Sequence, residues 1–396
     1  MNYILFDGEV RKALLPFTFT RPVADIRVGI LTIREKWETY LGYTTTTVTE
    51  EYLEAKYPMV EVEQNIMINS AFLPTEKLVE LIQSLKPKQA VGYQDDIVAF
   101  FTEEEQEDIN FEEYEILDFT DSLIKIANKW DIFQQNDGAI RQDYALLTED
   151  RISEPIPATV QVIGSEYIFI EEGAVLNFVT LNAATGPIYI GKNTEIMEGS
   201  VIRGPFALCE GAQVKMGTKI YGATTIGPEC RVGGEVSNSV MFGYSNKGHD
   251  GFLGNSVLGE WCNLGADTNN SNLKNNYTAV KLWNYEMEAY ESTGLQFCGL
   301  MMGDHSKSGI NTMFNTGTVV GVACSIFGGD FPKTYLPSFT WGKSAMDDVY
   351  DVDKAIKTMK MVMGRRHIDW TPEDEAIMRF LSEENKLERF QARLGR

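Results

Sequence analysis

The feature that most constrains the fold is a six-residue beat of aliphatic side chains in the middle of the chain. From Ile190 to Val232 every sixth residue is Ile, Leu or Val, over eight consecutive positions. If such residues fill roughly a fifth of a chain, chance gives this run about once in several hundred thousand trials. The same frame, shifted, returns on both sides of the run, at Ile170, Leu176, Phe252, Leu258, Leu264, Phe314 and Val320. The period therefore reflects a repeating structure.

A second regularity accompanies the beat, because a small side chain follows most of these residues after four positions. These small residues are Thr194, Ser200, Ala212, Thr218, Thr224 and Cys230. A six-residue unit is one short strand and one turn, and three units close a triangular coil. The aliphatic residue then points inward and the small one fits the corner, where Cys230, Cys262 and Cys324 act as apolar fillers. The pattern resembles the left-handed parallel β-helix of hexapeptide-repeat proteins, which are mostly trimeric acyltransferases that use acyl-CoA.

Composition limits the partners. The net charge of −22 includes the acidic stretch Glu103–Asp121, so the chain should repel nucleic acid and anionic membranes and bind phosphates only at a local cationic site. The chain has no long apolar run and no signal-like start, so we expect no membrane span and a cytoplasmic location. The five cysteines form no C-x-x-C pair, which argues against a disulfide framework or a zinc site.

The beat stops in two places, Gly234–Gly251 and Asn269–Asn311, and both are expected to leave the coil as loops. The chain has three histidines, and the breaks hold one each, His249 and His305. Acyl transfer to an amine needs a base with a pKa near neutrality, which histidine provides. His249, flanked by Lys247 and Asp250, is the candidate base. The alternative is a solvated surface histidine.

The segment KGHDGFLGNSVLGEWCNLGADTNNSN resembles the acetyltransferase half of the bifunctional UDP-N-acetylglucosamine pyrophosphorylase/glucosamine-1-phosphate N-acetyltransferases. The resemblance implies that His249 is the base and that Asn263 and Asn272 hold the sugar. It also implies that Ala266 lies along the path of acetyl-CoA.

The segment departs from this family at the sugar-contacting positions. Phe252 and Leu273 replace tyrosines, and the family's phosphate-pairing lysine falls near Asn238 and Ser239. Arg231, Lys247 or Lys274 could supply that charge. A second pair, His305 and Lys307, belongs either to a CoA-side loop or to a rival base.

Before the repeat, apolar segments alternate with helical patterns, which indicates an α/β domain. Tyr3–Asp7 and Gln64–Ser70 are predicted strands, and residues 22–41 are predicted to be helical. Such a domain places ligands near the loop after its first strand. That loop, FDGEVRKALLPFTFTRP, carries Arg11, Lys12 and Arg21 in an otherwise acidic chain.

With its place before a solenoid, this loop resembles a shortened sugar-1-phosphate nucleotidyltransferase domain. The resemblance implies that Asp7 and Gly8 begin a nucleotide loop, that Arg11 and Lys12 contact phosphates, and that Arg21 matches the cation after the loop. It also implies Mg²⁺, for which we identify no ligand beyond Asp95 or Asp96 as guesses. The family's glycine-rich phosphate cradle is missing, so a degenerate domain is the alternative.

We therefore expect an α/β domain over residues 1–150, a β-helix over 151–342 and a helical tail over 343–396. The leading hypothesis is a homotrimeric enzyme of nucleotide-sugar synthesis that uses a sugar phosphate, an NTP and acetyl-CoA. One domain could instead be inactive. A non-enzymatic scaffold that binds sugar nucleotides is the third possibility.

Overall fold

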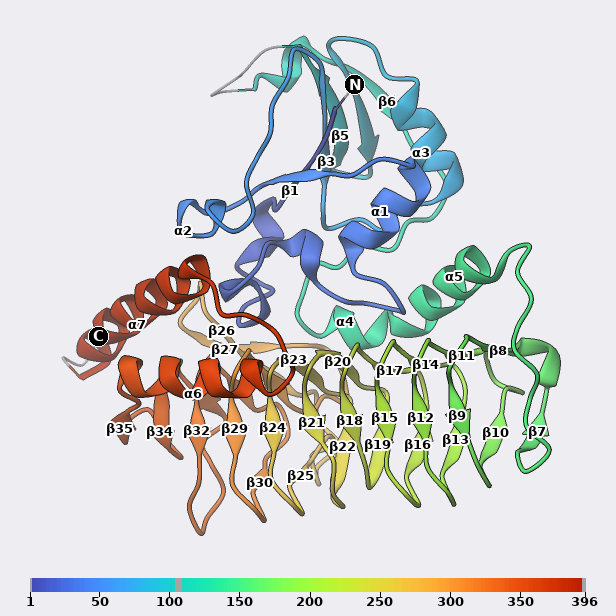
Figure 1. Ribbon diagram of the computed structural model, residues 1–396. Helices are drawn as coiled ribbons and strands as arrows, with labels where there is room; N and C mark the ends of the chain where they lie inside the picture. The colour runs from blue at the N-terminus through green and yellow to red at the C-terminus, as the bar shows by residue number, and fades with distance from the viewer. Residues whose placement is uncertain (1, 104–108, 394–396) are drawn as a thin grey trace.

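The computed structural model describes residues 2–103 and 109–393. An α/β domain lies along one side of a long three-sided prism, and two C-terminal helices lie at the far end of that prism (Figure 1). This arrangement confirms the predicted fold class, an α/β domain followed by a parallel β-helix of about ten turns and C-terminal helices.

Each side of the prism is one parallel sheet, apart from an antiparallel strand at the end of the third. The first face contains β7 (Gln161–Ile163), β10 (Thr180–Asn182), β13 (Val201–Arg203), β16 (Lys219–Tyr221), β19 (Glu235–Ser237) and β22 (Phe252–Gly254). Next to β22 lie the paired strands β25 (Asn269–Asn270) and β30 (Met313–Phe314).

The second face contains β8 (Ile168–Ile170), β11 (Ile188–Ile190), β14 (Phe206–Leu208), β17 (Thr224–Ile226), β20 (Val240–Gly243), β23 (Val257–Glu260), β28 (Met301–Met302), β31 (Val319–Val320) and β33 (Tyr335–Leu336). The third face contains β9 (Val175–Leu176), β12 (Glu195–Ile196), β15 (Gln213–Val214), β18 (Arg231–Val232), β21 (Asn246–Lys247), β24 (Asn263–Leu264), β29 (Lys307–Ser308), β32 (Ser325–Ile326), β34 (Thr340–Gly342) and β35 (Asp348–Val349).

The six-residue beat produces the prism as predicted. All eight residues from Ile190 to Val232 are buried in one core, and the small residues four positions later are buried as well. Each inward residue pairs with its copy in the next coil, as Ile202 does with Ile220. The stacked columns give the prism an apolar interior.

The first break, Gly234–Gly251, does not leave the coil, so that part of the prediction is wrong. It holds β19, β20 and β21, which continue the three faces. The coil is only shorter there: Val232 pairs with Lys247, fifteen positions on, whereas Ile202 pairs with a residue eighteen positions on. This shortening shifts the phase of the beat and places Lys247 at an inward position.

The second break leaves the coil only in part, because β28 and β29 within it continue the second and third faces. β26 (Lys281–Asn284) and β27 (Ala289–Ser292) form an antiparallel hairpin outside the three faces. The hairpin packs against the N-terminal domain, where Lys129 donates from Nζ to the carbonyl oxygen of Trp283 at 3.0 Å. It thereby fills part of the junction between the domain and the prism.

The N-terminal domain is built on a six-stranded mixed sheet in the order β2-β1-β3-β5-β4-β6. Its strands are β1 (Asn2–Phe6), β2 (Thr46–Val48), β3 (Asn65–Asn69), β4 (Gln89–Tyr93), β5 (Asp96–Thr102) and β6 (Glu115–Asp118). Its helices are α1 (Ile33–Leu41), α2 (Glu51–Glu54), α3 (Glu76–Gln83), α4 (Asp131–Gln134) and α5 (Asn136–Thr148).

The helix predicted for residues 22–41 is only half present. α1 begins after Thr32, which forms a capping box with Glu35. The residues before Thr32 are not helical, because their backbone N–H groups bond to side chains from elsewhere in the chain. Asp7 accepts the N–H of Val23, and Asp143 accepts that of Ile30. Tertiary hydrogen bonds here override a helical pattern.

The N-terminal domain packs on the second face of the prism. Phe242 of β20 packs against Phe17 of the N-terminal loop, with ring centroids 5.3 Å apart. α4 and α5 lie along the same face (Figure 1). At the far end α6 (Val352–Gly364) and α7 (Pro372–Arg393) share a core with Val322 and Phe339. Among the described residues no helix is long and apolar enough to cross a bilayer.

Candidate functional site

His249 lies on the corner where the chain passes from β21 on the third face to β22 on the first face, and its side chain is exposed. We call this edge of the prism the His249 corner. In the preceding coil the same corner is occupied by Gly234, at φ +76°, where a Cβ atom would lie 3.0 Å from the carbonyl oxygen of His249. A glycine is needed there for both reasons. The coils are thus packed tightly under an imidazole that faces solvent.

Lys247 holds the backbone of this corner from inside. Its side chain is 2% exposed, and its Nζ donates to the carbonyl oxygen of His249 at 2.7 Å. Burial lowers the pKa of Lys247 to about 8, against the opposing effect of Asp250 and Asp267. The structure therefore places the Lys247 ammonium beneath the histidine backbone.

Of the other predicted residues, Ala266 lies on the His249 corner one coil further on, where its carbonyl oxygen accepts from the N–H of Asn311 at 2.8 Å. Asn263 is on the third face, next to this corner. Asn272 and Lys274 lie beyond β25, where Asn272 donates to the Asn255 side chain and Lys274 to the Ala279 carbonyl. Ala266 and Asn263 therefore lie on or next to the His249 corner, whereas Asn272 and Lys274 lie beyond β25.

The first face carries a groove that was not predicted from the sequence. The register places Lys219, Glu235 and Phe252 side by side along the edge that borders the His249 corner. A groove of about 670 Å³ is lined by Arg203 and Lys219 together with Tyr221 and Glu235, and the Tyr221 hydroxyl donates to Glu235 at 2.6 Å. The sequence did contain a signal for this groove, because Arg203 follows the inward residue Ile202 and Lys219 precedes the inward residue Ile220.

In the N-terminal loop, Asp7 and Arg11 are both buried and paired with each other at 2.7 Å. Arg11 also donates to the carbonyl oxygens of Thr18 and Arg21 and to the Tyr52 hydroxyl. Gly8 adopts φ +62°, which favours glycine and allows the chain to turn after β1. The guanidinium of Arg11 therefore stabilises the conformation of the loop through hydrogen bonds to its backbone.

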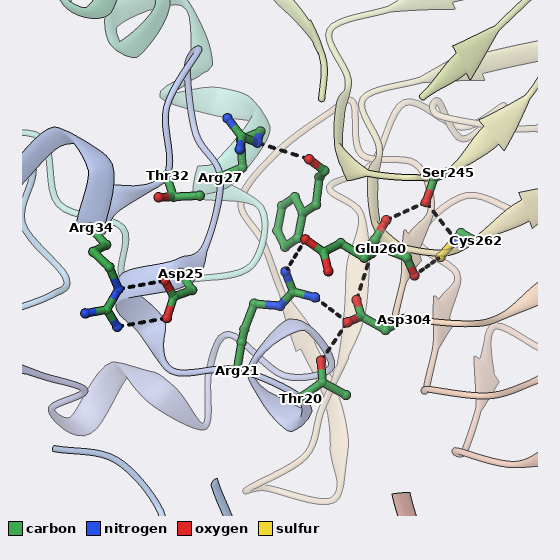
Figure 2. A network of polar contacts seen from close by, with 12 residues as sticks. Thr20, Arg21, Asp25, Arg27, Thr32, Arg34, Ser245, Glu260, Cys262 and Asp304 are labelled. Atoms are coloured by element: carbon green, nitrogen blue, oxygen red, sulfur yellow. Dashed lines mark hydrogen bonds and ion pairs between the residues drawn. The ribbon is translucent and has the colours of Figure 1, made fainter. Parts of the chain in front are cut away.

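The other two cations of the loop point to different surroundings. Lys12 is exposed and lies 3.2 Å from Glu286 of the β26–β27 hairpin. Arg21 is buried between Glu260 and Asp304 of the prism, with Thr20 donating to the same Asp304 (Figure 2). Burial alone would lower the pKa of Arg21, but the charges of Asp304 and Glu260 raise it above the ordinary value for arginine. Arg11, Lys12 and Arg21 do not converge on one phosphate-sized space.

His305 lies on a different corner from His249, between β28 on the second face and β29 on the third. It is 7% exposed, and burial together with Lys307, Lys56 and Arg21 holds its pKa well below the ordinary value. The two histidines therefore do not share a site. The Lys307 Nζ donates to the His305 carbonyl oxygen at 2.9 Å, as Lys247 does to that of His249.

The described residues contain no group of three or more His, Cys, Asp or Glu side chains that could hold a metal ion. Asp96, one of the two guessed ligands, pairs with Lys125 at 2.7 Å. A Mg²⁺ ion would therefore have to be held largely by the phosphates of a nucleotide, with at most one or two carboxylates of the described residues.

Residues 3–152 match the family described as sugar nucleotidyl transferase. The bifunctional protein GlmU of Synechococcus elongatus is 27% identical over 281 residues, covering 67% of this chain and 54% of the relative. A bifunctional sugar-1-phosphate nucleotidylyltransferase/acetyltransferase of Sulfurisphaera tokodaii is 29% identical over 192 residues, covering 43% of this chain and 47% of the relative.

A third relative, the bifunctional protein GlmU of Methanocaldococcus jannaschii, is 35% identical over 92 residues, which are 23% of this chain and 22% of the relative. The chain spans about half the length of the Synechococcus and Sulfurisphaera relatives it matches. The predicted resemblance to the bifunctional proteins is confirmed. The names of the relatives also agree with the predicted transferase class.

Proposed function

We propose that this protein is a transferase of nucleotide-sugar synthesis whose prism moves the acetyl group of acetyl-CoA to the amine of a hexosamine 1-phosphate. The observation that carries the proposal is the exposed imidazole of His249 on a corner that borders the first face, where a groove is lined by Arg203 and Lys219 together with Asp137 and Glu235. The likeness to acetyltransferases named above supports the same reaction class.

In the proposed reaction, His249 takes a proton from the acceptor amine as the amine nitrogen attacks the thioester carbonyl. A carbon–nitrogen bond forms and the carbon–sulfur bond breaks, and the proton passes to the departing thiolate of CoA. The developing oxyanion needs N–H donors, which the backbone of a tight glycine-rich corner can offer. Arg203 and Lys219 would hold the sugar phosphate and so replace the lysine that the sequence lacks.

We propose that a second copy of the chain closes the His249 corner, as in a trimer. Large apolar side chains are exposed along this corner on both sides of His249: Phe178 at 67%, Met216 at 70% and Ile310 at 72%. An aligned row of exposed apolar residues is typical of a subunit interface. Acetyl-CoA would then bind between neighbouring prisms, near Ala266.

The second candidate activity is nucleotidyl transfer from an NTP to the sugar phosphate in the N-terminal domain. The family match over residues 3–152 favours it. Because Arg11 and Arg21 are buried and held in ion pairs inside the fold, the exposed Lys12 is the loop cation best able to meet a phosphate.

The test of the first activity is release of free thiol from acetyl-CoA with glucosamine 1-phosphate as acceptor. Replacing His249 by Asn should lower kcat at least about 100-fold, because general base catalysis contributes that much. His367→Asn is the matched control, since His367 is also exposed but lies in the C-terminal part. An unchanged rate in the His249 variant would show that another group is the base.

The second activity is tested by pyrophosphate release from UTP and N-acetylglucosamine 1-phosphate with Mg²⁺ in solution. Turnover that falls in Lys12→Ala would support nucleotidyl transfer at the N-terminal loop. A screen of other NTPs and sugar 1-phosphates without any release would leave the acetyl transfer as the single activity.

A further inference from the structure

The hairpin of β26 and β27 belongs to the prism segment of the chain but reaches the loop that follows β1 in the N-terminal domain (Figure 1). At the turn of the hairpin, the carboxylate of Glu286 lies 3.2 Å from the ammonium of Lys12. Beside it, the ring of Tyr285 packs edge-on against Phe19 of the same loop, with centroids 5.3 Å apart. The hairpin therefore places an acidic side chain on the loop where we propose that a nucleotide binds.

The turn that carries this acid is held from several sides. The Trp283 ring stacks on Tyr335 of β33, with centroids 4.3 Å apart and an interplanar angle of 11°. The carbonyl oxygen of Trp283 accepts from Nζ of Lys129 at 3.0 Å, which ties the hairpin to the N-terminal domain. Within the turn, the side-chain oxygen of Asn284 accepts the backbone N–H of Glu286 at 2.9 Å. These contacts hold the backbone of Glu286 next to the loop.

Among the three cations of the loop, Lys12 is the one that can change its partner at small cost. The side chains of Arg11 and Arg21 are 8% and 6% exposed and are paired with buried carboxylates, so releasing either would leave a buried charge without its partner. The side chains of Lys12 and Glu286 are 63% and 61% exposed. Because water can solvate both groups when they separate, such a pair contributes little to stability. A phosphate can therefore replace Glu286 without unfolding the loop.

We propose that Glu286 makes an autoinhibitory contact, in which it occupies Lys12 until a phosphate group of a nucleotide displaces it. The carboxylate cancels the positive charge that Lys12 offers, in a chain whose net charge is −22, so the loop attracts phosphate weakly while the pair is closed. Because the acid comes from the prism segment and the cation from the N-terminal domain, one domain sets the phosphate affinity of the other. The inference rests on the proposed nucleotidyl transfer for the identity of its ligand.

The proposal is tested by isothermal titration of the full chain with UTP in the presence of Mg²⁺ and, separately, with inorganic pyrophosphate. Glu286→Gln keeps the size of the side chain and removes its charge, so it should tighten the binding of both probes about three- to fivefold. The matched control is Glu288→Gln, which removes the other exposed acid of the same turn. It should leave both affinities nearly unchanged.

A double-mutant cycle tests whether Lys12 is the cation involved. Lys12→Ala should weaken the binding of both probes about fivefold. Adding Glu286→Gln to that variant should have no further effect, because the carboxylate then has no cation to release. In the otherwise unaltered chain, the gain from Glu286→Gln should shrink as NaCl is raised from about 0.05 M to about 0.5 M, since an exposed pair is screened by salt.

The proposal is overturned if Glu286→Gln does not tighten binding, if Glu288→Gln tightens it equally, or if the gain persists without Lys12. It is also overturned if neither probe binds up to on the order of 10 mM. These readouts require no turnover, so they separate the contact from the activity. If the binding effects appear while no pyrophosphate is released, nucleotidyl transfer is refuted and the autoinhibitory contact stands.

Discussion

Replacing Lys247 by Met should make the protein more stable at neutral pH. Lys247 occupies an inward position of the prism, where it pairs with Val232 of the coil before it, and it is 2% exposed. An ammonium group at a place built for an aliphatic side chain is unfavourable. Methionine has a similar length and no charge, so it can fill the same volume.

The magnitude follows from the pKa of Lys247, which burial lowers from 10.5 to about 8. At about 1.4 kcal/mol for each tenfold change in the proton-binding constant, the charged form costs the folded protein about 3 kcal/mol. The hydrogen bond from Nζ to the His249 carbonyl oxygen offsets about 2 kcal/mol of this, and water can replace it at an exposed corner. We expect Lys247→Met to raise the free energy of unfolding by about 1 kcal/mol at pH 7.

The pH dependence has a definite sign. The unfolded chain keeps the proton on Lys247 up to about pH 10.5, whereas the folded chain releases it near pH 8. The penalty is complete below about pH 8 and disappears as the pH rises toward 10.5, so the advantage of the variant should vanish or reverse there. Urea unfolding at both ends of this range measures it, with Lys192→Met as the control on an exposed lysine.

Two results would refute this reasoning about Lys247. One is a loss of more than about 1 kcal/mol at pH 7, which would mean that the hydrogen bond to His249 outweighs the burial of charge. The other is a difference between the proteins that does not change with pH. The variant should also slow thiol release from acetyl-CoA about tenfold, because the backbone of the proposed base loses its support.

Two further substitutions test the packing of the coils and of the N-terminal domain. Gly251→Ala should lower the free energy of unfolding by about 3 kcal/mol, because φ is +114° and the added Cβ would collide with the Thr268 carbonyl oxygen. The control Gly217→Ala, at φ +66° with no neighbour within 4 Å, should lower it by only about 1 kcal/mol. Equal losses of the two variants in thermal unfolding would contradict the close approach at Gly251. Lys36→Met should cost about 3–5 kcal/mol because it leaves Asp143 buried without its cation. That loss should shrink in acid, where Asp143 takes up a proton, and a loss that grows in acid would contradict the ion pair.

The parts of the fold that the sequence predicted are those fixed by short-range patterns. The inward columns follow from a period of six, and the strands predicted at Tyr3–Asp7 and Gln64–Ser70 are present as β1 and β3. Residues 23–31 were predicted wrongly because Asp7 and Asp143 accept their backbone N–H groups. Asp143 lies more than a hundred positions from Ile30, so the sequence around Ile30 gives no sign of this hydrogen bond.

At the candidate site, the sequence located His249 but not its surroundings. The coil that carries it is shorter than its predecessors, so counting in sixes does not place Lys247 inside the prism. Arg203 and Lys219 were overlooked because each looks like an ordinary outward residue beside an aliphatic one. Only the register shows that Lys219 borders the corner of His249.

Arg21 shows why a cation in a resembling loop is weak evidence of phosphate binding. Its neighbours in sequence resemble those of a nucleotide loop, yet Glu260 and Asp304 come from coils more than two hundred positions away. Releasing Arg21 toward a phosphate would leave the buried carboxylate of Asp304 without its cation and close to that of Glu260, which is strongly unfavourable. Arg21 is therefore committed to joining the domain to the prism, so any nucleotidyl transfer in this chain must obtain its positive charge elsewhere, with Lys12 as the first residue to test.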